Sequence, residues 1–116
     1  IEFGWGCMSE RDPEKAADFI IRSAKPYAQA KANRMYLEEY RKTKKALLMN
    51  ASDGKTVSDR ESYAYAHPEY EEVLNKFKDA ILDEETLRVQ IKGAELTIEI
   101  WRSQNASNRN QDRTMR

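Results

Sequence analysis

Apolar residues recur along most of the chain at the three- and four-residue spacing of a helix, not at the alternate spacing of a strand. One such segment extends from residue 13 to about 50, and a second from Pro68 to about Ser103. A loop signal at 50–54 and a short helical segment at 59–66 separate the two. The pattern predicts an all-α fold: a helical hairpin of two long helices with short connecting helices.

Local signals set the limits of the first long helix. Asp12 is a favourable N-cap, and Pro13 suits the first helical position. Pro26 lies inside the segment, lacks a backbone donor and clashes with the preceding turn. We therefore expect a kink or break near 23–25, with the main helix over 27–50.

The connection between the long helices contains its own signals. Gly54 is available for a left-handed position after the first helix. Ser58 and Glu61 match the capping-box pattern, in which two side chains satisfy unpaired backbone N–H groups reciprocally. Pro68 disfavours a helical conformation at His67, so the second long helix is expected to begin at Pro68.

The second long helix carries an apolar seam typical of helices packed as in coiled coils. Two heptad positions are apolar or aromatic from Tyr70 to Trp101, except at Glu84. We expect Glu84 to pair with a cation of the first helix or to set the register. The seam residues assigned to the core or to an oligomer interface are Phe77, Leu87, Ile91, Ile98 and Trp101.

A second apolar row lies on roughly the opposite face of that helix. Its members are Leu82, Val89, Leu96 and Ile100. A helix that is apolar on two faces must be covered on two sides, and one partner helix covers only one of them. Either the short helices or another copy of the chain must cover the second row, and we expect a homo-oligomer.

Both ends of the chain are set apart from a single helical domain over 9–103. Residues 1–8 resemble a cloning scar or a disordered start, because Met8 and the polar residues after it look like a natural beginning. Alternatively they are native, and their aromatic side chains pack on the domain. Residues 104–116 are polar and without period, so they are expected to be disordered or to order on binding.

Composition excludes several classes of protein. The 116 residues contain 4 Gly, 3 Pro, 1 Cys and 1 His, too few soft ligands for a structural zinc site. No apolar run approaches the length of a membrane span, and no secretion signal is evident, so a cytoplasmic setting is expected. Neighbouring carboxylates on a helix point in different directions, and Asp53–Thr56 lacks the upstream glycine of a phosphate-binding loop. We expect no catalytic site, no metal and no cofactor.

Charge is unevenly distributed although 20 basic and 20 acidic residues cancel. The balance is +5 over 25–55, −6 over 56–86 and +3 over 87–116. The candidate anion contacts are the cluster Arg41, Lys42, Lys44 and Lys45 and the tail arginines Arg109, Arg113 and Arg116. Repeated around an oligomer, such clusters can bind a phosphate backbone. Alternatively, the cluster is a solvated last helical turn that complements the helix dipole.

Two tyrosines add to this candidate surface. Tyr36 and Tyr40 lie one helical turn apart, next to the cationic cluster. Aromatic side chains beside cations stack on bases in single-strand binders. Alternatively, both tyrosines belong to the core or its boundary.

The layout of residues 25–105 resembles the UvsY family of recombination mediators of T4-like phages. The similarity lies in Lys44–Leu47, in Lys55–Tyr65 and in a long helix that ends with Ile98–Arg102. It implies a helical hairpin, ring oligomers, single-stranded DNA binding, and loading of a recombinase onto DNA covered by a single-strand-binding protein. By the same resemblance, DNA-contact candidates are Lys42, Lys44, Lys45 and Arg60. The polar segment 104–116 departs from the family pattern.

Two functional hypotheses follow. The first is a non-catalytic DNA-recombination accessory protein of phage type, which self-assembles and binds single-stranded DNA in the host cytoplasm. The second is a helical adaptor for protein–protein assembly without nucleic-acid binding, with the acidic segment 56–86 as its docking face. Binding of DNA that weakens with salt would favour the first hypothesis.

Overall fold

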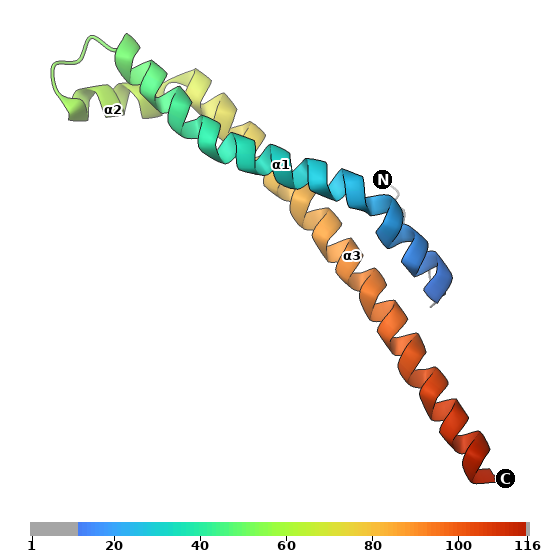
Figure 1. Cartoon of the computed structure of the whole chain (residues 1–116). Helices are drawn as coiled ribbons and strands as arrows, with labels where there is room; N and C mark the ends of the chain where they lie inside the picture. The colour runs from blue at the N-terminus through green and yellow to red at the C-terminus, as the bar shows by residue number, and fades with distance from the viewer. Residues whose placement is uncertain (1–11, 116) are drawn as a thin grey trace. The chain divides into compact units, whose positions relative to one another are not determined.

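The computed structural model describes residues 12–115, which form three helices (Figure 1). They are α1 (Pro13–Ala51), α2 (Val57–Ala66) and α3 (Pro68–Met115). No strand occurs in this part of the chain. The predicted all-α helical hairpin of two long helices with a short connecting helix is confirmed, whereas the oligomeric state stays a prediction.

The helices contribute to two compact units, where the sequence suggested one helical domain. We call residues 12–27 together with 86–115 the terminal unit, and Ala28–Glu85 the loop unit. Each unit has its own cluster of buried apolar side chains. The predicted scar at residues 1–8 lies outside the described residues.

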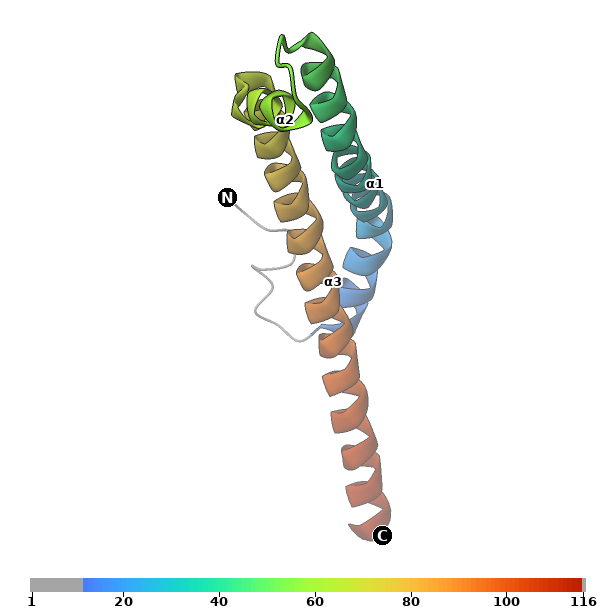
Figure 2. The ribbon, with the colours of Figure 1, turned by 90° about the vertical axis from the view of Figure 1, so that its left-hand side faces the viewer.

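The loop unit packs the C-terminal part of α1 against the N-terminal part of α3, with α2 beside the connection (Figures 1 and 2). Leu48, Ala64 and Tyr70 bring one buried side chain from each helix into a common cluster. Leu37 of α1 and Val73 and Ala80 of α3 are also buried. The seam positions of α3 therefore face α1 in this unit.

The terminal unit packs the first turns of α1 against the middle of α3. Ala16 and Phe19 of α1 are buried with Ala94 of α3, and the partly buried Ile91 and Ile98 pack against them. The expected cap at Asp12 is confirmed, because its carboxylate accepts hydrogen bonds from the N–H groups of residues 14 and 15.

The helix α1 passes through Pro26 without interruption, so the predicted break near 23–25 and the separate main helix over 27–50 are wrong. The alternative, a kink near 23–25, stays a prediction. Proline removes one backbone donor, which leaves the carbonyl of Arg22 without its usual helical partner. Arg22, Lys25 and Pro26 are all exposed, so water can hydrate that carbonyl. The cost of the proline is thereby limited to one solvated turn.

The helix α2 begins earlier than predicted, and its cap is a different residue. Thr56 is the N-cap, and its hydroxyl accepts a hydrogen bond from the N–H of Asp59 at 3.1 Å. The expected capping box of Ser58 and Glu61 is wrong, because Ser58 is inside the helix and the Glu61 carboxylate lies 3.8 Å from Lys45 Nζ. Capping from position 56 lets the helix include Val57.

Gly54 is required by close packing, not by the expected left-handed backbone. No described residue has a positive φ. A Cβ atom at position 54 would lie 2.9 Å from Cβ of Asp59 and 3.2 Å from the backbone nitrogen of Arg60. The loop therefore approaches the first turn of α2 too closely for a side chain at this position.

The helix α3 continues beyond Ser103 to Met115, through the segment predicted to be disordered or to order on binding. The prediction of disorder is wrong. From Glu99 to Thr114, every side chain is exposed except that of Asn105, which is half-buried. The segment has no apolar period, and for this reason its sequence does not predict a helix. In the structure it corresponds to a helix in which no side chain over 99–114 is buried.

Candidate nucleic-acid interface

The polar seam residue Glu84 pairs with Arg34 of α1, as the sequence suggested for an unspecified cation. Arg34 donates two hydrogen bonds to the Glu84 carboxylate, at 2.6 and 3.2 Å, and a third to Glu38 at 3.0 Å. The hydrogen bond with Glu84 is the main cause of a raised pKa of the Arg34 guanidinium. Glu84 is only 8% exposed, so this bidentate pair is an internal element of the loop unit, not a binding site.

Two lysines of the predicted cationic cluster also have internal partners. Lys44 Nζ lies 3.5 Å from a carboxylate oxygen of Glu69. Lys45 Nζ lies 4.7 Å above the ring of Tyr65, besides its ion pair with Glu61. A hydrogen bond with Tyr65 is the main cause of a raised pKa of Lys45. These ammonium groups hold α1 against α2 and α3 within the loop unit.

The other three predicted DNA-contact residues are also engaged. The Arg41 guanidinium lies 5.6 Å from the centre of the Phe77 ring. Arg60 donates a hydrogen bond from Nε to the carbonyl of Gly54 at 2.9 Å. Lys42 Nζ lies 3.5 Å from Glu39, but both of these side chains are mostly exposed. Lys42 is therefore the member of the cluster that is most accessible to a ligand.

The tyrosine pair near this cluster is accessible on one side. The rings of Tyr36 and Tyr40 are stacked, with centres 5.7 Å apart and planes 15° apart. Tyr36 is 62% exposed, whereas Tyr40 is half-buried. The Tyr36 ring is thus held by its neighbour in the loop unit while much of its surface meets solvent.

The second apolar row of α3 is not covered within the described chain. Val89, Leu96 and Ile100 are 56%, 53% and 44% exposed in the terminal unit, and Leu82 of the loop unit is 64% exposed. Trp101 is 44% exposed, so its predicted place in the core is not supported, and its interface role stays a prediction. The other seam residues, Phe77, Leu87, Ile91 and Ile98, are half-buried.

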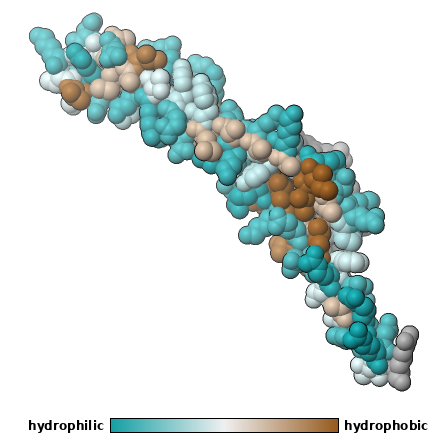
Figure 3. Space-filling model, in the orientation of Figure 1, coloured by the Kyte–Doolittle hydropathy of each residue, from teal (hydrophilic) through white to brown (hydrophobic). Residues whose placement is uncertain are grey.

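The surface distribution of hydropathy follows these exposures. In the view of Figure 3, brown apolar patches gather over the N-terminal part of α1 and the adjoining part of α3 in the terminal unit. Ile21 of α1, which is 74% exposed, is among the unburied apolar residues of this unit. The C-terminal end of α3 is mostly teal, in keeping with its polar composition (Figure 3).

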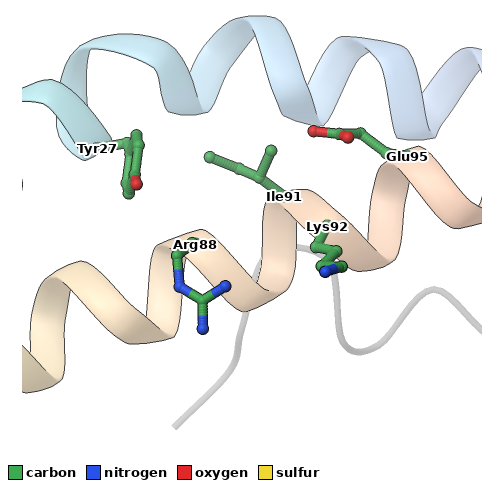
Figure 4. Close-up of a pocket in the computed structure, with 5 residues that line it drawn as sticks. All are labelled: Tyr27, Arg88, Ile91, Lys92 and Glu95. Carbon is green, nitrogen blue, oxygen red and sulfur yellow. The ribbon is translucent and has the colours of Figure 1, made fainter.

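A groove of about 290 Å³ lies in the terminal unit (Figure 4). Tyr27 of α1 reaches toward α3, and Ile91 and Glu95 of α3 reach toward α1, whereas the charged ends of Arg88 and Lys92 lie away from α1. The lining therefore combines an aromatic ring, an aliphatic side chain and charges of both signs. This mixture does not select one ligand chemistry.

Because the predicted helix ends near Ser103, the sequence does not reveal that Arg102 shares a helix face with two later arginines. Arg102, Arg109 and Arg113 are all exposed residues of α3. At 100° per residue, they fall within about 40° of arc on one helix face. Arg109 and Arg113 are among the predicted anion contacts of the polar tail, whereas Arg102 is not. Extending the helical register through 104–115 would have aligned the three.

No protein-family model, no curated protein and no solved structure matches the chain. Within residues 12–115, no helix combines the length and apolar character required to cross a membrane. The same residues contain no group of three or more His, Cys, Asp or Glu side chains placed to hold a metal ion.

Proposed function

We propose that this chain is a non-catalytic accessory protein that self-associates and binds single-stranded DNA, in the manner of a recombination mediator. The observation that carries the proposal is the stacked pair of Tyr36 and Tyr40, with Tyr36 exposed and the accessible Lys42 in the same helix. An aromatic platform offers stacking to an unpaired base, and an accessible cation of the same helix attracts the phosphates of the strand. A recombinase and a single-strand-binding protein are the further partners that the family resemblance implies.

The proposal fits the accessibility of the tyrosine. A ring held parallel by its neighbour loses little additional side-chain freedom when a base stacks on its open face. Base stacking on an aromatic side chain contributes about 1–3 kcal/mol per base and tolerates different sequences. Binding without sequence preference is what an accessory protein requires along any single strand.

The test measures the affinity of the full chain for a fluorescently labelled oligothymidylate by anisotropy at several salt concentrations. Tyr36→Ala is expected to weaken binding roughly 5- to 150-fold, the range that corresponds to the loss of one stacked base. Met35→Ala removes a neighbouring side chain that is 51% exposed and should leave the affinity unchanged. No binding by the wild-type chain at low salt, or equal affinities for both variants, would refute the proposal.

A second candidate function is a protein assembly adaptor without nucleic-acid binding. It is favoured by the exposed apolar residues Val89, Leu96 and Ile100, which recur at helical spacing on α3. Burial of aligned apolar groups under a second helix is favourable and stabilises the association of the two helices. The engagement of Lys44, Lys45 and other basic side chains in internal contacts also fits this function.

The two candidates are separated by measuring size and DNA binding on the same sample. Size-exclusion chromatography with light scattering would be run with and without the labelled oligonucleotide. A multimer that takes up the strand at low salt and releases it at high salt supports the mediator-like function. A multimer that ignores DNA at every salt concentration supports the adaptor.

A further inference from the structure

The C-terminal part of α3 is a helix that no buried side chain of its own stabilises. Over 101–114, no side chain is buried, and the nearest buried residue of α3 is Ala94. The segment is continuous with the packed part of α3, so its helix needs no new nucleation, but no apolar face of it is stabilised by packing. Asn, Ser and Thr, which are abundant here, are also weak helix formers. A partner that contacts this segment would therefore stabilise its helix.

The side chains of this segment indicate what the partner is. Over 102–114, Ala106 is the only apolar residue, so a second copy of the same segment would gain almost no apolar burial. Three arginines, Arg102, Arg109 and Arg113, oppose one acid, Asp112. Within the described chain, none of the three guanidinium groups has an ion-pair partner, and like charges on paired helices would repel. The segment is suited to a polyanion and not to itself.

The spacing of the arginines narrows the class of polyanion. Along the helix axis, Arg102 and Arg113 are about 16 Å apart, with Arg109 between them on the same face. A row of this length can contact several successive phosphates of one strand. The helix dipole accounts for a cation in the last turn, where Arg113 lies, but not for Arg102, which lies three turns upstream.

The neighbouring residues favour a nucleic acid over an acidic protein. Trp101 is 44% exposed at the start of the row and can stack on an unpaired base. Amide and hydroxyl side chains that donate and accept hydrogen bonds surround the arginines, namely Ser103, Gln104, Asn105, Ser107, Asn108, Asn110, Gln111 and Thr114. Such groups form hydrogen bonds with base edges and with phosphate oxygens. A nucleic acid presents both kinds of group, whereas an acidic peptide does not.

We propose that the arginine face of α3, formed by Arg102, Arg109 and Arg113 with Trp101 at its start, contacts the phosphates of a single-stranded nucleic acid. This inference rests on the proposed function and locates the main phosphate contacts in the terminal unit. The lysine cluster of the loop unit, whose charges are largely engaged internally, contributes less.

The test compares two triple variants with the same loss of charge in the full chain. Arg102, Arg109 and Arg113 are replaced by Gln in one, and the exposed Lys15, Lys25 and Lys31 in the other. Affinity for a labelled oligothymidylate is measured by anisotropy between low and moderate salt. Each lost phosphate contact reduces the slope of log K against log salt by about 0.7, so the arginine variant should lose about 2 units of slope.

The expected result is at least a roughly tenfold weaker affinity for the arginine variant at moderate salt, with little change for the lysine variant. Replacement of the three arginines by Lys should retain most of the slope, which separates charge from helix disruption. Circular dichroism of each variant shows whether the helix content changes.

Equal affinities and slopes for the two Gln variants would overturn the inference while leaving the proposed function intact. Absence of binding by the wild-type chain would overturn both. Binding of duplex DNA but not of the oligothymidylate, or binding of an acidic peptide such as polyglutamate with equal affinity, would also refute the assignment of a single strand.

Discussion

At the scale of single residues, the terminal unit depends on very few side chains. Phe19 is 6% exposed and is the largest side chain of the cluster that includes Ala16 and Ala94. The small alanines allow the aromatic ring to fit between the two helices. Little else in this unit is buried, so the contribution of Phe19 to stability cannot be replaced by neighbours.

We expect Phe19→Ala to reduce the free energy of unfolding by about 3–5 kcal/mol, through lost burial and a residual cavity. Ile21→Ala is the matched control, since Ile21 is 74% exposed in the same helix and its truncation should change stability by less than about 0.5 kcal/mol. Urea unfolding followed by circular dichroism measures both. Similar losses for the two variants would show that Ile21 is covered in solution.

The pair of Arg34 and Glu84 also acts at the residue scale. Glu84 occupies a seam position where the heptad would otherwise place an apolar side chain, and its carboxylate receives two hydrogen bonds from Arg34. A carboxylate that is almost buried is tolerated only with such a partner. The pair therefore fixes which residue of α1 lies opposite Glu84.

Glu84→Gln should lower the melting temperature, because the guanidinium then faces a neutral amide. The double variant Arg34→Met with Glu84→Met should recover much of the loss, since two apolar groups of similar length restore packing without a charge. Thermal unfolding followed by circular dichroism compares the three proteins. A double variant that is less stable than Glu84→Gln would contradict this account.

At the scale of elements, the start of α2 separates a sequence pattern from its structural result. Thr56 and Ser58 are both suitable caps, and the pair of Ser58 and Glu61 completes a better-known motif. The structure uses Thr56, while Glu61 lies near Lys45 of α1. Glu61 therefore pairs with a residue of another helix instead of capping the N-terminus of α2.

The element-scale prediction compares these two hydroxyl residues. Thr56→Ala should destabilise the protein by about 1 kcal/mol because the N–H of Asp59 loses its acceptor. Ser58→Ala lies inside the helix and should be neutral or slightly stabilising, given the high helix propensity of alanine. Chemical denaturation resolves a difference of this size. A larger loss of stability for Ser58→Ala than for Thr56→Ala would contradict this prediction and favour the capping box of Ser58 and Glu61.

The sequence predicted the elements that have strong local or periodic signals. Asp12 and Pro13 mark the start of α1, Pro68 marks the start of α3, and the seam around Val73 and Ala80 identifies the face that packs. Periodicity did not reveal the helix beyond Ser103, because a helix without apolar residues has no such signal. The partners of the lysine cluster depend on tertiary contacts and could not be deduced from spacing alone.

At the scale of the whole molecule, the main exposed apolar surface of the described residues is the second apolar row of α3. Val89, Leu96 and Ile100 recur at helical spacing in the terminal unit, and none of them is buried in the described chain. Exposed apolar groups in such an alignment favour association with another helix. The homo-oligomer proposed from the sequence would cover this row with a second copy of the chain, and it stays a prediction.

Leu96→Ser is expected to weaken self-association at least roughly tenfold, because a central apolar group of the row becomes polar. Leu74→Ser, on a residue that is 38% exposed in the loop unit and outside the row, serves as the control. Light scattering over a dilution series gives the dissociation constants. A wild-type chain that is monomeric at every concentration would exclude this interface.

The separation of the two buried clusters has a consequence for the order of folding. Leu48, Ala64 and Tyr70 are separated by fewer than 25 positions in the sequence, so their cluster forms by closing short loops. Phe19 and Ala94 are distant in sequence, so their contact requires the closure of a long loop. Formation of the loop unit joins the two long helices first and shortens the effective loop for the terminal unit. Substitutions at Leu48 should therefore slow folding, whereas those at Phe19 should mainly accelerate unfolding.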